Sequence, residues 1–152
     1  MIRIEEKILI GAPIEVVFDA ERNISLHEAT QKSRGEKAVA GVTSGLIEKN
    51  QEVEWEANHF GIRQRLRVRI EEMEKPAYFR VRMVFGAFKS FCHDHRFREA
   101  GVNRTEKYDL MQIEAPMGFV GRIVEILFLR SYMRRFLRKK NAELKALLEK
   151  SG

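Results

Sequence analysis

The chain has 152 residues, which is enough for one domain with a buried core, and we interpret residues 1–152 as a single domain. Its lone cysteine, Cys92, excludes an intrachain disulfide. The sequence shows neither a secretory signal nor an apolar run long enough to cross a bilayer, so we expect a cytoplasmic protein.

The formal net charge of +6 raises nucleic acid or an anionic membrane as partners. Residues 118–150 contain nine lysines and arginines against three glutamates, so this segment alone accounts for the whole excess. Such a basic segment is most often a solvated helix face, and cations also suit the end of a helix dipole. The chain lacks the aromatic platform and the zinc-finger or RNP-type motifs of nucleic-acid-binding proteins, so we expect no nucleic-acid partner.

The first third of the chain predicts a strand followed by two short helices. Residues Ile2–Ile10 alternate in the manner of a half-buried strand. The residues expected to face inward are Ile2, Ile4, Glu6, Ile8 and Ile10. Pro13 suits the first turn of a helix, and Asn23 suits the N-cap of a second one. Residues 34–50 contain three glycines and predict a short strand near Lys37–Ala40 followed by an irregular loop.

Alternating apolar and charged residues between positions 52 and 85 predict three antiparallel strands. The residues expected to face inward are Val53, Trp55, Ala57 and His59, then Ile62, Gln64, Leu66, Val68 and Ile70, then Phe79, Val81, Met83 and Phe85. Glutamates on the outer face of the first strand fall beside arginines on the outer face of the second, which suits cross-strand ion pairs at a wet surface. The arginine row is therefore better explained as sheet surface than as a nucleic-acid groove.

Two further strands, at residues 90–99 and 105–116, contain two of the four histidines. A side-chain period of two places both of these histidines on the same face as the neighbouring phenylalanines. The residues expected to face inward are Phe91, His93, His95 and Phe97 on the first of these strands and Asp109, Met111 and Ile113 on the second. Cys92 then points outward, so covalent catalysis by this thiol is not expected.

Residues 118–150 predict one long amphipathic helix, with no proline and no glycine after Gly121. Its apolar residues recur at three- and four-residue steps. The residues expected on the inner stripe are Phe119, Ile126, Met133, Leu137, Leu144 and Leu148. At about 1.5 Å per residue the helix would be about 45 Å long, so it must lie across a broad partner, which the strands supply.

The order of these elements predicts an α+β protein with a helix-grip fold. A curved antiparallel sheet would wrap around the long C-terminal helix, with two short helices after the first strand. Because a sheet that wraps a single long helix commonly leaves a cavity between them, the side chains on the inner faces become the candidate site.

Stretches along the whole chain match a known pattern, among them APIEVVF, AGVTSGLI, EVEWEANHFGIRQRL, GAFKSFCHDHRF and APMGFVGR. HDHRF and APMGFVGR are the more specific of these. Together they resemble the SRPBCC superfamily of START-like and birch-pollen-allergen-like proteins, and within it a bacterial branch that is similar to polyketide cyclases and dehydrases. The resemblance implies a cavity for an apolar or amphipathic small molecule, such as a lipid, sterol, polyketide or hormone. We expect no cofactor.

All four histidines fall where they could face this cavity, with His27 on the second short helix. Our leading hypothesis is that they are partly buried and hydrogen-bonded, so that they give an apolar pocket a polar end that orients a ligand. The residues that we expect to contact the ligand are Trp55, His59, Leu66, Met83, Phe85, Phe91, His93, His95, Phe97, Asp109, His27, Ile126 and Met133.

Two alternatives use the same residues for chemistry. His93, His95 and Asp109 could act as acid and base in a cyclisation or dehydration of a polyketide-like substrate. An acid that is common in related chains is Val81 here, which weakens the transfer of a catalytic carboxylate. His59, with the same three residues, could also bind a metal, but without a cysteine pair or an HExxH motif this signal is weak, and we expect no metal.

The first half of the predicted helix is apolar nearly all round, because Val124, Phe128 and Tyr132 fall opposite the inner stripe. We expect the protein's own short helices and a loop to cover that side, in a monomer or a homodimer. The alternative is an interaction module that docks through this helix on a lipid surface or a protein. Glu6 is either a carboxylate in the pocket or a sign that the first strand has another register.

Overall fold

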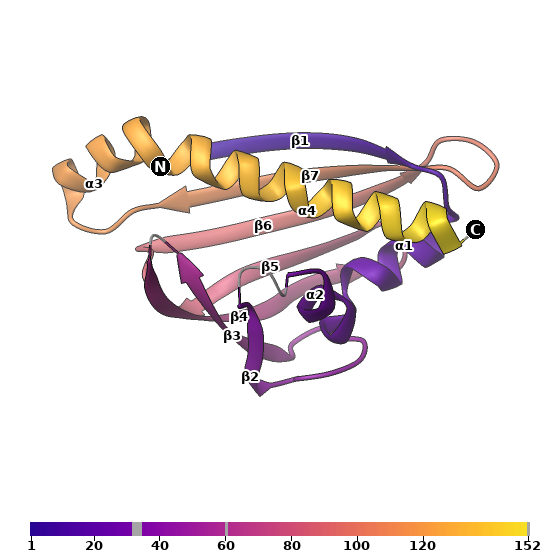
Figure 1. Cartoon of the computed structure of the whole chain (residues 1–152), viewed down its shortest axis with the longest axis horizontal. Helices are drawn as coiled ribbons and strands as arrows, with labels where there is room; N and C mark the ends of the chain where they lie inside the picture. The colour runs from indigo at the N-terminus through magenta and orange to yellow at the C-terminus, as the bar shows by residue number, and fades with distance from the viewer. Residues whose placement is uncertain (32–34, 60, 152) are drawn as a thin grey trace.

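The computed structural model describes residues 1–31, 35–59 and 61–151, and within them one antiparallel sheet curves around a long C-terminal helix (Figure 1). The strands are β1 (Ile2–Ile10), β2 (Lys37–Gly41), β3 (Glu52–His59), β4 (Ile62–Glu74), β5 (Tyr78–Phe85), β6 (Ser90–Glu99) and β7 (Thr105–Glu114). Their order in the sheet is β1-β7-β6-β5-β4-β3-β2. The predicted helix-grip fold is therefore confirmed. Arg34, in the segment predicted as strand and loop, lies outside the described residues.

Two short helices, α1 (Ile14–Glu21) and α2 (Ile24–Thr30), follow β1 as predicted. Asn23 caps α2, because its side-chain oxygen accepts a hydrogen bond from the Leu26 N–H at 3.0 Å. The C-terminal helix runs without interruption through α3 (Gly118–Val124), a π-helical turn η2 (Glu125–Leu129) and α4 (Arg130–Ser151). None of the helices within the described residues has both the length and the apolar character needed to cross a membrane.

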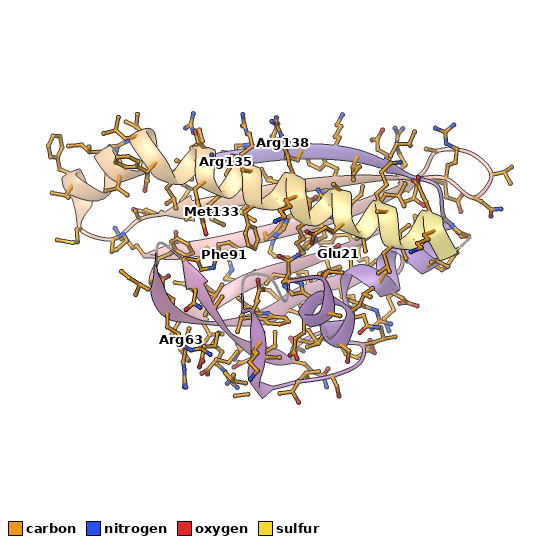
Figure 2. The ribbon with its side chains drawn as sticks, viewed as in Figure 1. Glu21, Arg63, Phe91, Met133, Arg135 and Arg138 are labelled. Atoms are coloured by element: carbon orange, nitrogen blue, oxygen red, sulfur yellow. The ribbon has the colours of Figure 1, made fainter. Side chains whose placement is uncertain are left out.

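The hydrophobic core has two parts. In the first, the Phe18 ring of α1 meets the rings of Phe79 and Phe97 edge to face, with centroids 5.5 and 5.4 Å apart. In the second, Met133 and Leu137 of α4 pack over β1, β6 and β7. Figure 2 shows Met133 on the side of α4 that faces the sheet, near Phe91 of β6. The first part includes Leu144 near the end of α4, whereas the second lies under Met133 and Leu137. Residues of both parts line a common space between the sheet and the helix.

The alternation predicted for the strands sets the two faces of the sheet. His93, His95 and Asp109 are buried on the face toward the helix. On the opposite face, Glu52 accepts a hydrogen bond from Arg69 at 2.9 Å, and Glu56 accepts one from Arg65 at 3.1 Å. This row of exposed pairs is the predicted cross-strand ladder, and each pair contributes little to stability because water screens it.

Phe85 does not face inward as predicted, because the pairing of β4 with β5 is irregular at this point. Met83 lies opposite Val68, but Phe85 lies opposite Arg67, so β5 has one more residue than β4 between these pairs. Residues directly opposite each other in an antiparallel pair share a face, and Arg67 faces outward. The extra residue therefore turns Phe85 to the outer face, where its side chain is 46% exposed.

The inner stripe of the helix was predicted correctly only for its second half. Met133, Leu137 and Leu144 are buried, but Phe119 and Ile126 are 78% and 73% exposed. The wider turn of η2 adds a residue to the helical repeat, and the buried positions up to its end become Gly121, Glu125 and Leu129. None of these three buried residues belongs to the predicted stripe.

Candidate functional site

A cavity of about 300 Å³ lies between the sheet and the C-terminal helix. Its walls are mostly apolar, and strands β3 to β7 supply one side while α4 supplies the other. Representative wall residues are Val53, Leu66, Val68, Phe91, Met133 and Leu137. The volume is at the lower end of the range of small-molecule sites, which begins at about 300 Å³.

Eight of the thirteen residues expected to contact a ligand lie on the wall of this cavity. They are His27, Trp55, His59, Leu66, Phe91, His93, His95 and Met133. Asp109 is buried behind His93, Met83 packs in the second part of the core, and Phe97 packs in the first. Phe85 and Ile126 are exposed and do not belong to the wall, for the reasons given above.

One end of the cavity is closed by a buried hydrogen-bonded group on β6, β7 and α4. His93 Nε2 donates to Asp109 Oδ1 at 2.9 Å. The other oxygen of this carboxylate accepts from Lys107 Nζ at 2.6 Å and from Asn141 Nδ2 at 2.8 Å. Lys107 Nζ also donates to Asn141 Oδ1 at 2.8 Å. Lys107 and Asp109 have no solvent exposure, so each charge depends on the other for compensation.

A second carboxylate, Glu21 at the end of α1, approaches the same group from the other side. Its Oε1 accepts from Lys140 Nζ at 3.2 Å and lies 3.7 Å from Lys107 Nζ. His95 Nδ1 lies 3.1 Å from Glu21 Oε1 and 3.2 Å from Asp109 Oδ1, although neither contact has the direction of a hydrogen bond. Figure 2 shows Glu21 beneath α4. Two carboxylates and two ammonium groups thus balance one another.

The protonation states follow from burial and from these charges. Burial lowers the pKa of His93 to about 3, and His95 contributes in the same direction, so His93 is neutral near pH 7. Burial alone would raise the pKa of Asp109, but Lys107 and the hydrogen bond from His93 outweigh it and hold that pKa well below its usual range. Burial opposes the charge of Lys140, but Glu21 and Asp109 raise its pKa. The closed end therefore has fixed charges and a neutral imidazole.

Two further histidines lie on the cavity wall, each hydrogen-bonded to a residue of another segment. His27 Nε2 lies 2.6 Å from Glu36 Oε1, and the His27 ring stacks at a tilt on Trp55 with centroids 4.3 Å apart. His59 Nδ1 lies 2.6 Å from the hydroxyl oxygen of Tyr132 on α4. The second of these contacts joins the end of β3 to the helix across the cavity.

The geometry does not favour a metal. Ligand atoms of His93, His95 and Asp109 lie within 4.8 Å of one another, which is close enough for a shared ion. However, Lys107 already compensates the charge of Asp109, and a divalent cation would sit beside that ammonium group. His59, the fourth residue of the metal hypothesis, is hydrogen-bonded to Tyr132 instead.

Sequence reasoning missed Glu21, Lys107, Lys140 and Asn141. Lys107 is two residues before Asp109, so the same strand period places it on the inner face. Asn141 is four residues after the buried Leu137, which is a helical repeat. Both signals were present in the sequence. Inner faces are identified from apolar residues, however, so a lysine or an asparagine at an inner position is not selected. Glu6 shares the expected inner face of β1 with Ile4 and Ile8, so the register of that strand is as predicted. It is not a carboxylate of the pocket, because it accepts from Arg138 Nε at 2.8 Å and is not on the cavity wall.

The other end of the cavity opens to solvent beside α3. Ala87, Pro116 and Val124 line that end, and all three are exposed. In contrast, Glu21 and His95 at the closed end are buried. The site is therefore an apolar pocket with an open end next to α3 and a buried polar end beneath α4.

A helix-grip fold with a pocket between sheet and helix defines the structural class of this chain. No protein-family model matches the chain, and a search of curated proteins found no match. Solved structures do match, and the START superfamily protein from Mycobacterium smegmatis is similar at 11% identity, over 99% of both chains, with a TM-score of 0.73.

Two other matches broaden this group. The protein TTHA0849 from Thermus thermophilus is similar at 16% identity over 99% of both chains, with a TM-score of 0.79. The ginseng major latex-like protein 151 from Panax ginseng is similar at 12% identity over 96% of both chains, with a TM-score of 0.72. At these identities the likeness establishes the fold. The fold that the resemblance to the SRPBCC superfamily implies is therefore confirmed.

Proposed function

We propose that the protein is a ligand-binding domain that takes up an apolar or amphipathic small molecule in the cavity beneath α4. The observation that supports this most is the polarity of the cavity, which has apolar walls, an exposed end and a buried polar end. An apolar wall supplies affinity, and a few fixed polar groups supply orientation. A molecule with one polar group on an apolar body matches this arrangement.

His93 is the group best suited to orient such a ligand. Because its Nε2 donates to the ionised Asp109, the neutral ring has no proton on Nδ1, which is left as an acceptor. A hydroxyl group on the ligand could donate to that nitrogen. A pKa of about 3 makes His93 a weak base near pH 7, so the site favours binding over acid–base turnover.

Trp55 provides a direct test, because it is the only tryptophan of the chain and lies on the cavity wall. The probe is 8-bromooctan-1-ol, an apolar chain with a hydroxyl group at one end and a bromine atom at the other. Bromine quenches tryptophan fluorescence only at short range. Titration of the probe should therefore give saturable quenching of Trp55.

Variants locate the binding. Ala57→Phe places a ring in the cavity, because Ala57 is buried on its wall, and should weaken probe binding by a factor of about ten, the loss of roughly 1.4 kcal/mol of contact. Val39→Phe is the matched control, since Val39 is exposed on β2 and not on the wall. Quenching that never saturates, or that Ala57→Phe leaves unchanged, would rule out the proposal.

A further inference from the structure

The apolar side chains at the start of the C-terminal helix form an exposed surface that we call the α3 surface. It consists of Met117, Phe119, Val120, Ile126, Leu127 and Phe128. Phe119 and Ile126 keep 78% and 73% of their area in contact with solvent. Figure 1 shows that α3 lies beyond the end of the sheet, while α1 and α2 lie toward the other end of the helix. The prediction that the short helices cover this side is therefore wrong.

The same helix shows that this exposure is particular to its first half. Within α4 the exposed positions include Arg135, Arg138 and Lys139, as on a solvated helix face. Figure 2 shows Arg135 and Arg138 on the side of α4 away from the cavity. Before Arg130 the exposed positions are nearly all apolar. A contiguous apolar surface of this kind usually marks an interaction site.

Positive charge borders the α3 surface. Arg122, Arg130 and Arg135 are exposed, and none of them forms an ion pair within the part of the chain that the structure describes. A second copy of the chain would bring the same cations together, and their repulsion opposes a homodimer through this surface. Anionic lipid headgroups would instead neutralise the arginines while the apolar side chains enter the interface.

The α3 surface also adjoins the open end of the cavity. Val124 and Pro116 line that end; Val124 lies within the segment that carries the exposed apolar side chains, and Pro116 directly precedes it. We infer that the α3 surface docks on the surface of an anionic lipid bilayer, with the open end of the cavity facing the lipid. This inference rests on the proposed function in one respect, namely that a ligand would pass between bilayer and cavity without crossing water.

Sedimentation with vesicles tests the docking. Wild-type protein should sediment with vesicles of phosphatidylglycerol and phosphatidylcholine, and much less with vesicles of phosphatidylcholine alone. The double variant Phe119→Asp, Leu127→Asp should lower the partition coefficient at least about tenfold, because each substitution removes an apolar side chain from the interface. Val102→Asp is the matched control. Val102 is 91% exposed on the turn between β6 and β7, at the other end of the sheet.

A second pair of variants tests the charge. Arg122→Glu with Arg130→Glu should lower binding to anionic vesicles by a factor of at least about thirty, because each change removes an attractive charge and adds a repulsive one. Arg98→Glu, an exposed arginine at the far end of β6, should leave binding unchanged. Raising the ionic strength to about 0.5 M should also weaken the binding of the wild type.

Three results would overturn the docking inference. They are absence of binding to anionic vesicles at low salt, binding that the Phe119 and Leu127 changes do not alter, and a dimer in light scattering that the same changes dissociate. The last would assign the surface to a second copy. Quenching of Trp55 by 8-bromooctan-1-ol without vesicles should be the same in this variant and the wild type, so failure of docking is distinguishable from failure of ligand binding.

Discussion

The two ends of the cavity reverse the usual distribution of side chains in a globular protein. At the closed end, Lys107 and Asp109 form a fully buried ion pair. Beside the open end, on the α3 surface, Phe119 and Ile126 are apolar and exposed. Folding alone favours neither arrangement. Buried charges lose their hydration, and exposed apolar side chains contribute no free energy of burial.

The difference indicates what each end is built for. A buried, balanced set of charges holds polar groups in fixed positions, which suits the orientation of a ligand. An exposed apolar surface beside free cations suits a partner that has its own apolar interior and anionic surface. The following changes, from the largest expected effect to the smallest, test this contrast.

Lys107→Met should have the largest effect on stability. It removes the ammonium group that compensates Asp109 and leaves a buried charge, which typically costs about 3–5 kcal/mol. Lys89→Met is the control, because Lys89 pairs with Glu114 at an exposed site and should lose no more than about 1 kcal/mol. Urea denaturation followed by circular dichroism measures both. Equal losses in the two variants would mean that the buried charges are not coupled as described.

The closed end also predicts a pH dependence of stability. The pKa of His93 is about 3 in the folded protein and 6.5 ordinarily, so below pH 6.5 the unfolded chain binds a proton that the folded protein does not. The stability that the folded protein gains from holding His93 neutral is present in full above pH 6.5, and it is lost as the pH falls toward 3. Between pH 6 and 5 it should lower the free energy of unfolding by at most about 1.4 kcal/mol per unit.

His93→Gln isolates this contribution from that of His27, whose pKa is also lowered, chiefly by burial and then by Lys140. The variant should show a shallower decline of stability with falling pH. Urea denaturation at several pH values measures the slope. A slope identical to that of the wild type would show that His93 is not held neutral by the fold.

Glu125→Ala tests how the open end is held to the sheet. The buried Glu125 accepts a hydrogen bond from the Ala115 N–H at 2.7 Å, and its loss leaves that donor unsatisfied at a cost of about 1–3 kcal/mol. Glu125→Gln keeps an acceptor oxygen and should lose less. Hydrogen exchange of the Ala115 amide should be faster in the alanine variant. Unchanged exchange would mean that this bond does not hold the start of the helix.

Phe119→Ala should have the smallest effect on folding. The side chain is exposed, so its removal should change the free energy of unfolding by no more than about 0.5 kcal/mol. Phe18→Ala is the comparison, because the buried Phe18 contacts two other rings and should lose about 3–5 kcal/mol. A large loss from Phe119→Ala in urea denaturation would mean that the α3 surface stabilises the fold itself.

The sequence predicted the strands well, because a period of two allows only two orientations of each strand. His93, His95 and Asp109 were therefore placed on the correct face. Phe85 was misplaced because the alternation of apolar and charged residues gives no sign of the extra residue in β5. Ile126 was misplaced because a π-helical turn changes the repeat without a proline or glycine to signal it.

The polar end of the site was harder to predict than the walls. Glu21 reaches the group around Asp109 through the packing of α1 against β6, and no local pattern reports a contact between segments so far apart in sequence. Lys107 was within reach of the strand period but was passed over because buried lysines are rare. The apolar walls can be predicted from the periodicity of the sequence. The paired buried charges cannot, because they depend on tertiary contacts.

The most direct test of ligand binding is the position of the bromine atom in crystals soaked with 8-bromooctan-1-ol. Anomalous scattering locates that atom independently of any effect on Trp55. The account predicts a bromine peak inside the cavity, between Trp55 on the sheet and Met133 on α4. A peak only on the α3 surface, or an unoccupied cavity at a saturating concentration of the probe, would contradict it.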